Sequence, residues 1–307
     1  MKSSGLLLCL LLGACGGGGG DSSPVAGPVP EANAPLPAEP GAAPSPAPAA
    51  SASIVAPPGW TLVWSDEFDV DGLPDATKWG FDTERNQLGW YNNEQQYYAS
   101  NRLENSRVQN GFLTITAIKD ALTGAPDYGG QSYTAARMNT RGKASWTYGF
   151  FEVRAKLPCS LGTWPAIWML STGGRWPEDG EIDIMEQKGF SAAEKTRVSG
   201  TIHTTAYNYF GGTLDVGQGA STTVADACTK FHNYQLTWSV DKIVIGVDGF
   251  NYFEFVNPKD GDYNKWPFSN PQFMILNLAM GGDLGGAIPS NFVSDQMVVD
   301  YVRVFQK

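Results

Sequence analysis

The sequence predicts an all-β protein whose globular part is a sandwich of two antiparallel sheets. Three observations predict this fold class. Apolar and polar residues alternate over many short runs, turn-forming Gly, Asn, Asp and Pro separate the runs, and no long stretch keeps a helical period. The length of 307 residues and the hydrophobic content of 42% suffice for one all-β domain of about 250 residues behind an N-terminal extension.

The first 14 residues have the pattern of an export signal. Lys2 precedes an apolar stretch that is shorter than the ~20 residues needed to span a bilayer, and small residues follow. The run from Leu12 to Cys15 resembles a bacterial lipoprotein box, which implies cleavage before Cys15 and lipidation of its thiol. We therefore expect an exported protein, anchored by lipid to the bacterial cell envelope at the outer membrane, or extracellular. Ordinary secretion with an incidental cysteine is the alternative.

Residues 15–58 are expected to form a linker that starts at the lipidated Cys15. Gly, Ala, Pro and Ser dominate this segment, which has almost no large apolar residues and cannot build a core. A Pro-rich chain of this kind is extended, with a reach on the order of 100 Å at ~3.1 Å per residue. Residues 59–307 are then the globular domain.

Several runs within this domain have strand character. In the run from Gly149 to Lys156, small or apolar residues alternate with charged ones, as in a strand with one buried face. An Asp-Gly turn follows another apolar run at Asp248. The predicted strands are, in order, Leu113–Ala117, Gly149–Lys156, Tyr234–Ser239, Ile243–Val247, Phe273–Leu278 and Val298–Phe305.

The run GEIDIMEQ, from Gly180 to Gln187, places three carboxylates at an unusual spacing. On a strand, Glu181 and Asp183 share one face, but strict alternation turns Glu186 to the other. One extra residue, a β-bulge at Ile184 or Met185, returns Glu186 to the first face. The spacing therefore predicts three acids on one surface.

Such a trio suits glycoside hydrolysis. The two glutamates lie about four strand steps apart, or ~13 Å between Cα atoms. On a curved sheet their carboxyl groups can converge to ~5–6 Å, the separation typical of a retaining glycosidase. Glu181 is then the nucleophile, Glu186 the general acid and later base, and Asp183 the group that orients and tunes them. Crowding should keep one of the acids protonated near neutral pH.

The alternative is a solvated strand edge that carries acids for solubility. Trp164, Trp168 and Trp176 lie close by in the sequence and favour the first interpretation, because aromatic faces hold sugar rings. The net charge of −10 and the absence of a basic cluster argue against nucleic acid and against anionic membrane surfaces as partners. A neutral substrate is expected, and the membrane is reached only through the lipid anchor.

Two cysteines remain in the expected globular part, Cys159 and Cys228. In an oxidising compartment they suggest one disulfide, although two separately buried thiols are an open alternative. No cysteine pairing has the spacing of a metal site.

The ordered motifs of the domain resemble glycoside hydrolase family sixteen, and most closely its bacterial laminarinase-like endo-β-1,3-glucanases. The resemblance covers about residues 64–305. It implies a jelly-roll sandwich with a concave substrate cleft, and it gives the three acids the roles described above. The motifs are WSDEFD, WYNNEQQYY, YTAARMNTRGK, YGFFEVRAKLP, GTWPAIWML, GEIDIMEQ, GTIHTT, LNLAMGGDLGG and VDYVRVF.

The resemblance also implies binding residues. The positions that match the cleft are Asn93, Arg137, Trp164, Trp168 and His203. Asn93 could instead serve a turn, Arg137 a structural ion pair and His203 the core, whereas Trp168 could be partly structural. Relatives carry a calcium ion on the convex side, and the matching ligands are Glu67, the carbonyl of Gly111 and Asp300. This ion would stabilise the fold, and catalysis would need no cofactor.

The expected function is endo-hydrolysis of a laminarin-type β-1,3-glucan with retention, by a monomer. A mixed-linkage β-1,3-1,4-glucanase, an agarase or a carrageenase of the same fold are alternatives, and a non-catalytic glucan-binding lectin is the least favoured. Asp283 stands where relatives often have Asn, which leaves the contacts at that edge of the cleft open.

Overall fold

The computed structural model describes residues 56–208 and 218–307. Over these residues, seventeen strands form two sheets, and the helical elements are one four-residue α-helix, α1 (Gly282–Gly285), and two 3-10 turns, η1 (Tyr91–Asn93) and η2 (Glu194–Thr196). The predicted all-β class is confirmed. The predicted signal peptide, the lipidated Cys15 and nearly all of the predicted linker lie outside the described residues.

One sheet has ten strands. Its main path runs in the order β15, β14, β13, β8, β17, β5, β6, β3, while β1 pairs with β17 and β4 with β5. All pairs are antiparallel except the short pair of β3 with β6. The strands are β1 (Thr61–Asp66), β3 (Gln96–Tyr98), β4 (Ser106–Gln109), β5 (Phe112–Ile118), β6 (Tyr133–Ala135), β8 (Gly149–Lys156), β13 (His232–Trp238), β14 (Lys242–Val247), β15 (Phe250–Val256) and β17 (Ser294–Gln306).

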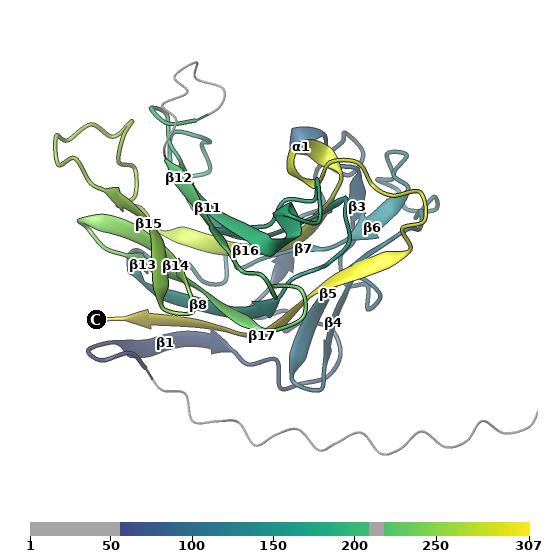
Figure 1. Cartoon of the computed structure of the whole chain (residues 1–307), viewed down its shortest axis with the longest axis horizontal. Coiled ribbons are helices and arrows are strands. Elements are labelled where there is room, and N and C mark those ends of the chain that lie inside the picture. Colours follow the sequence, from purple (N-terminus) through teal and green to yellow (C-terminus); the bar gives the residue numbers. More distant parts are fainter. Residues whose placement is uncertain (1–55, 209–217) are drawn as a thin grey trace, which may run out of the picture. The chain divides into compact units, whose positions relative to one another are not determined.

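The other sheet has seven antiparallel strands, in the order β12, β11, β10, β9, β16, β7, β2. They are β2 (Gly80–Phe81), β7 (Arg137–Asn139), β9 (Thr163–Ser171), β10 (Glu181–Glu186), β11 (Arg197–His203), β12 (Gly219–Thr223) and β16 (Gln272–Met280). Figure 1 shows the two sheets as stacked layers. Each strand predicted from the sequence overlaps an observed one, and the predicted run from Gly149 to Lys156 coincides with β8.

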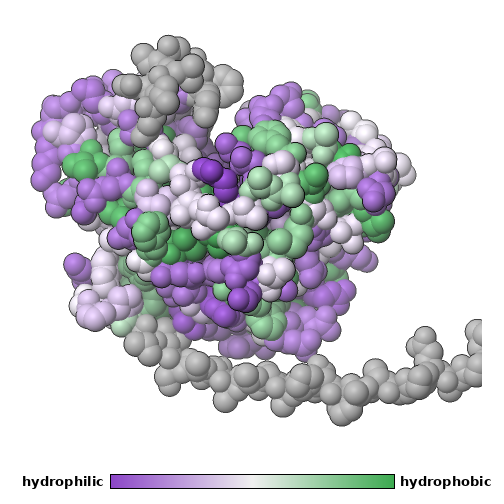
Figure 2. All heavy atoms as spheres, viewed as in Figure 1, coloured by the Kyte–Doolittle hydropathy of each residue, from purple (hydrophilic) through white to green (hydrophobic). Residues whose placement is uncertain are grey.

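The core lies between the two layers. In β8, Phe151, Val153 and Ala155 are fully buried, while the charged side chains between them are partly exposed. The alternation in the sequence therefore corresponds to an inner and an outer face of the strand. Ile167 and Met169 of β9 fill the core from the opposite sheet. Figure 2 shows the surface hollowed between the end that carries β12 and the end that carries α1, over the seven-stranded sheet.

The described residues contain no helix of the length and apolar character that a membrane span requires.

Candidate active site

The predicted bulge is present in β10. Between Asp183 and Glu186 the strand has three residue steps, whereas the facing segment of β11, from Thr201 to Ser199, has two. The pairing of β10 with β9 slips by one residue at the same place. The extra residue restores the register, as the sequence analysis expects, and this prediction is confirmed.

The bulge also separates acids from apolar residues. Ile184 and Met185 are 1% and 0% exposed and belong to the core, whereas Glu181 and Glu186 remain partly exposed. Asp183, between the two glutamates, is buried. The kinked strand therefore presents a central buried acid flanked by two acids that a ligand can reach.

Asp183 is the most strongly perturbed acid of the trio. Its Oδ2 lies 3.1 Å from Nε2 of His203, and its carboxyl group also shares a hydrogen bond with Glu181. Burial, followed by the charges of Glu181 and Glu186, raises the pKa of Asp183 well above its usual value. A protonated Asp183 can donate the shared hydrogen bond and so hold the Glu181 carboxylate in place.

Glu186 has the properties of a general acid. Burial and, more weakly, the charge of Glu181 raise its pKa, while His203, Lys188 and a hydrogen bond from Trp164 act in the opposite sense. The indole N–H of Trp164 donates to Oε1 of Glu186 over 3.0 Å. The bond fixes the carboxyl group, and the raised pKa keeps a proton on it at higher pH than usual.

Glu181 is held from the other side by Trp176, whose indole N–H donates to Oε2 of Glu181. Trp176 is 43% exposed, and its ring centroid lies 6.2 Å from that of His203. Glu181 also faces His203 directly across the pairing of β10 with β11. Each glutamate is thus oriented by its own tryptophan, and His203 contacts the middle of the trio.

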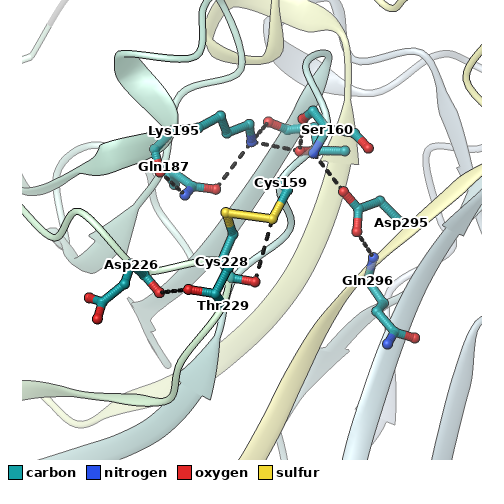
Figure 3. The surroundings of a disulfide bond; sticks show 10 residues. Cys159, Ser160, Gln187, Lys195, Asp226, Cys228, Thr229, Asp295 and Gln296 are labelled. Atoms are coloured by element: carbon teal, nitrogen blue, oxygen red, sulfur yellow. Dashed lines mark hydrogen bonds between the residues drawn. A yellow bond between two sulfur atoms is a disulfide. The ribbon is translucent and has the colours of Figure 1, made fainter.

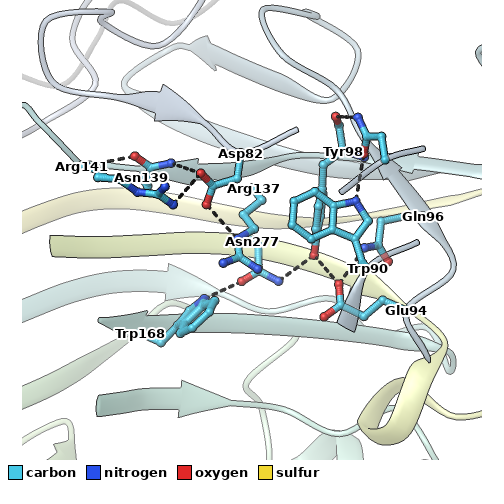
Figure 4. Close-up of polar contacts among 11 residues, drawn as sticks. Asp82, Trp90, Glu94, Gln96, Tyr98, Arg137, Asn139, Arg141, Trp168 and Asn277 are labelled. Carbon is cyan, nitrogen blue, oxygen red and sulfur yellow. Dashed lines mark hydrogen bonds and ion pairs between the residues drawn. The ribbon is translucent and has the colours of Figure 1, made fainter. Parts of the chain in front are cut away.

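A chain of hydrogen bonds starts at Trp168, next to the trio, and leads to Glu94 (Figure 4). Trp168 lies beside Asp183 in the strand pairing and donates its indole N–H to Oδ1 of Asn277 over 2.7 Å. Asn277 donates to the hydroxyl of Tyr98 over 3.0 Å, and that hydroxyl donates to Oε2 of Glu94 over 3.1 Å. Burial is the main cause that raises the pKa of Glu94.

Arg137 forms the structural ion pair that was the alternative to a binding role. Its Nε donates to Oδ2 of Asp82 over 3.0 Å in a buried ion pair. Its guanidinium carbon also lies 5.2 Å from the ring centroid of Trp90 and 4.7 Å from that of Trp168, so the group is held between two aromatic rings. The ion pair therefore positions Arg137 beside a tryptophan of the sheet that carries the acids.

Asn93 lies in the exposed turn η1, with a left-handed φ of +57°. Its Nδ2 donates to Oδ1 of Asp283 in α1 over 2.7 Å. The turn chemistry named as an alternative for Asn93 is therefore present, and Asp283 has a structural partner.

The structure suggests one group of side chains with metal-binding potential. Within residues 56–208 and 218–307, ligand atoms of Glu181, Asp183 and His203 lie within 4.8 Å of one another. These atoms also contact one another, and their arrangement already fits acid catalysis.

The two carboxylates among the predicted calcium ligands each form an ion pair. Both oxygens of Glu67 accept from Arg303, over 3.0 and 2.7 Å, and Asp300 pairs with Arg154. Gly111 lies in the turn between β4 and β5 with a φ of +79°. A calcium ion at these residues would compete with Arg303 for Glu67 and with Arg154 for Asp300.

Cys159 and Cys228 form a disulfide with a Cα separation of 5.2 Å (Figure 3). Cys159 lies in the connection from β8 to β9, and Cys228 precedes β13. The bond therefore ties the connection between β8 and β9 to the connection between β12 and β13.

Sequence reasoning did not assign a site role to four residues of this region. Trp176 could have been found, because a tryptophan five residues before Glu181 can reach back to it. The contacts of Asn277 and Asp82 had no local signal, since their partners Tyr98 and Arg137 lie far away in the chain, whereas Glu94 accepts from Tyr98 only four residues on.

Comparisons with known proteins agree on one family. The family described as Glycosyl hydrolases family 16 matches residues 93–303. A β-glucanase of Rhodothermus marinus is 47% identical over 260 residues, which cover 81% of this chain and 86% of the relative.

Two solved structures are also similar. A non-specific endo-β-1,3(4)-glucanase of the same family has a TM-score of 0.77 and 50% identity, with 83% of this chain and 94% of that chain covered. The laminarinase of Rhodothermus marinus has a TM-score of 0.73 and 46% identity, with 80% and 97% covered.

Proposed function

Because the chain belongs to glycosyl hydrolase family 16, we propose that it cuts internal β-1,3 bonds of a laminarin-type glucan with retention of configuration. One observation carries this proposal. The bulge in β10 puts Glu181 and Glu186 on one accessible face, and burial raises the pKa of Glu186. A retaining glycosidase requires such a pair, in which one carboxylate attacks while the other acid supplies a proton.

The first step forms a covalent intermediate. Glu181 attacks the anomeric carbon, and Glu186 gives its proton to the departing glycosidic oxygen. In the second step Glu186, now ionised, takes a proton from water, and the water oxygen displaces Glu181 from the anomeric carbon. Both glutamates return to their starting states.

Asp183 and His203 support the nucleophile. A hydrogen bond from protonated Asp183 stabilises the Glu181 carboxylate and can also steady it when it leaves the sugar. His203, 3.1 Å from Asp183, fixes the orientation of that acid. Neither residue needs to touch the sugar for this role.

The glucan lies across the strands of the seven-stranded sheet. The path from β10 to Arg137 on β7 crosses three strand spacings, or ~14 Å, which exceeds one sugar ring. Trp164, Trp168 and Arg137 line this path, and Asn93 stands at its rim. Trp168 is partly exposed and Asn93 is exposed, so an aromatic ring and an amide group are accessible to the faces and hydroxyl groups of glucose units.

A mixed-linkage glucan is the second candidate substrate. The specific reason is the similarity to an endo-β-1,3(4)-glucanase whose name states that it is non-specific. The net charge of −10 disfavours the sulfated substrate of a carrageenase. Retained Glu181 and Glu186 disfavour a non-catalytic lectin.

The N-terminal pattern supports a place for this activity outside the cytoplasm. We propose that residues 1–14 direct export and that lipid on Cys15 anchors a monomeric enzyme, with residues 15–58 as tether. A mass shift of the purified protein that disappears in Cys15→Ala would test the anchor. The disulfide of the domain is compatible with such an oxidising location.

Reducing-end analysis tests the activity. The enzyme should release oligosaccharides from laminarin faster than from barley glucan, and should leave agarose and carrageenan intact. Glu181→Gln should abolish hydrolysis while laminarin binding persists in affinity electrophoresis, and proton NMR of early products should show the β-anomer. Unchanged turnover in Glu181→Gln would refute the nucleophile assignment.

A further inference from the structure

Lys195 is a buried charged residue outside the catalytic trio. It lies in η2, is 4% exposed, and its Nζ donates three hydrogen bonds (Figure 3). The acceptors are the carbonyl oxygen of Thr163 at 2.9 Å, the hydroxyl of Thr163 at 2.6 Å and Oε1 of Gln187 at 3.1 Å. A buried ammonium group is costly unless its protons are all bonded, and these three acceptors meet that requirement.

Each acceptor residue is the sequence neighbour either of Glu186 or of Trp164, the hydrogen-bond donor to Glu186. Gln187 directly follows Glu186, and Thr163 directly precedes Trp164, whose indole donates to Glu186. Gln187 also donates from Nε2 to the carbonyl of Lys195 over 2.8 Å, so the two residues bind each other in both directions. Lys195 therefore joins the backbone segments on either side of the Trp164–Glu186 hydrogen bond.

The same cluster reaches the disulfide. The hydroxyl of Thr163 donates to the carbonyl of Ser160 over 2.7 Å, and Ser160 adjoins the bonded Cys159. The backbone N–H of Ser160 donates to Asp295 over 2.6 Å. One end of the Lys195 cluster is therefore linked to β17 through Asp295 and, through the disulfide, to the loop that precedes β13.

The position of the cluster matters because it follows the bulge. A bulge interrupts the regular ladder of hydrogen bonds, so the residues after it are held less firmly by their neighbours. Glu186 is the first reactive residue after the bulge, and its carboxyl group must be aimed at the leaving oxygen with a tolerance well below 1 Å.

We propose that Lys195 is a positioning residue for the general acid: its ammonium group clamps Gln187 to Thr163 and thereby keeps Glu186 and Trp164 in register. This inference rests on the proposed function. It assigns to Lys195 no contact with the sugar.

The charge of Lys195 is compatible with this role. Burial lowers the pKa of Lys195 to about 7, and the carboxylate of Asp295 acts in the opposite sense. In mildly acidic solution, where Glu186 keeps its proton, Lys195 therefore has one proton for each of its three acceptors.

The test compares two substrates that differ in their need for an acid. Laminarin requires protonation of its leaving oxygen, whereas dinitrophenyl β-laminaribioside releases an acidic phenol that leaves without it. In Lys195→Met, kcat/KM on laminarin should fall about 10- to 100-fold, as expected for misplacement of a catalytic group. The value for the dinitrophenyl substrate should stay within about threefold of the wild-type value.

Two reference variants calibrate the result. Glu186→Ala should show the same selective loss in a stronger form, and Lys230→Met should be unaffected on both substrates. Lys230 is a matched control because its side chain is 72% exposed and forms an ion pair with Asp226, in the loop that precedes β13. Equal losses of Lys195→Met on both substrates, or no loss on laminarin, would overturn the proposal.

Thr163→Val provides a second route in case Lys195→Met does not fold. It removes one acceptor and keeps the side-chain shape, so thermal unfolding should remain cooperative and the loss should be smaller but equally selective. A folded Thr163→Val without selectivity would also reject the inference. A wild-type protein that cleaves neither substrate would instead reject the proposed function.

Discussion

Glu181 and Glu186 have the same side chain but different neighbours. Glu181 receives hydrogen bonds and faces His203, whereas burial and the charge of Glu181 favour the neutral form of Glu186. At the residue scale, the division of labour between nucleophile and acid follows from these surroundings rather than from residue type.

This difference predicts a pH dependence. The alkaline limb of kcat/KM reports loss of the Glu186 proton, and it should lie above the usual range of a glutamate because the pKa of Glu186 is raised. In Glu181→Gln the repulsive charge is gone while burial remains, so the pKa of Glu186 should fall without becoming normal. Carbon-13 NMR titration of the carboxyl carbons measures this shift, with Glu186→Gln for assignment. An identical pKa in wild type and Glu181→Gln would contradict the coupling.

At the element scale, the bulge in β10 decides which side chains face the substrate. Deleting Met185 should keep Glu186 on the face of Glu181 and Asp183 and preserve part of the hydrolysis, because the three acids then stand two residues apart and strict alternation needs no bulge. Met185→Leu keeps the residue count and similar volume and should retain most activity, with a stability loss below about 1.5 kcal/mol. Laminarin assays and thermal unfolding of both variants provide the measurement. A folded deletion variant that hydrolyses no laminarin would contradict this account of the register.

The bulge was predictable because the mismatch between an acid spacing of five and a strand period of two is visible in eight residues. The strands were predictable for the same reason, since alternation is local. The chain from Trp168 through Asn277 and Tyr98 to Glu94 was not, because it joins residues that are up to 183 positions apart in sequence only after β3, β9 and β16 have assembled. The register between strands that are far apart in the chain has no signal in the local sequence, whereas the alternation within one strand does.

At the scale of the whole molecule, the calcium prediction can be decided by stability. If calcium binds at Glu67, EDTA should lower Tm by about 2–4 °C, as expected for a loss of ~1 kcal/mol in a domain of this size. Glu67→Gln should remove the response. A Tm that EDTA leaves unchanged would favour the pairing of Glu67 with Arg303 that the structure contains.

The place of β17 has a further consequence for biosynthesis. Residues 294–306 lie between β8 and β5 in the ten-stranded sheet, and β1 from the start of the domain also pairs with them. Until the ribosome has released this segment, the sheet lacks a central member and the earlier strands have no complete partner. The nascent polypeptide should therefore complete its ten-stranded sheet only after residues 294–306 have been synthesised, because β8 and β5 are joined through them.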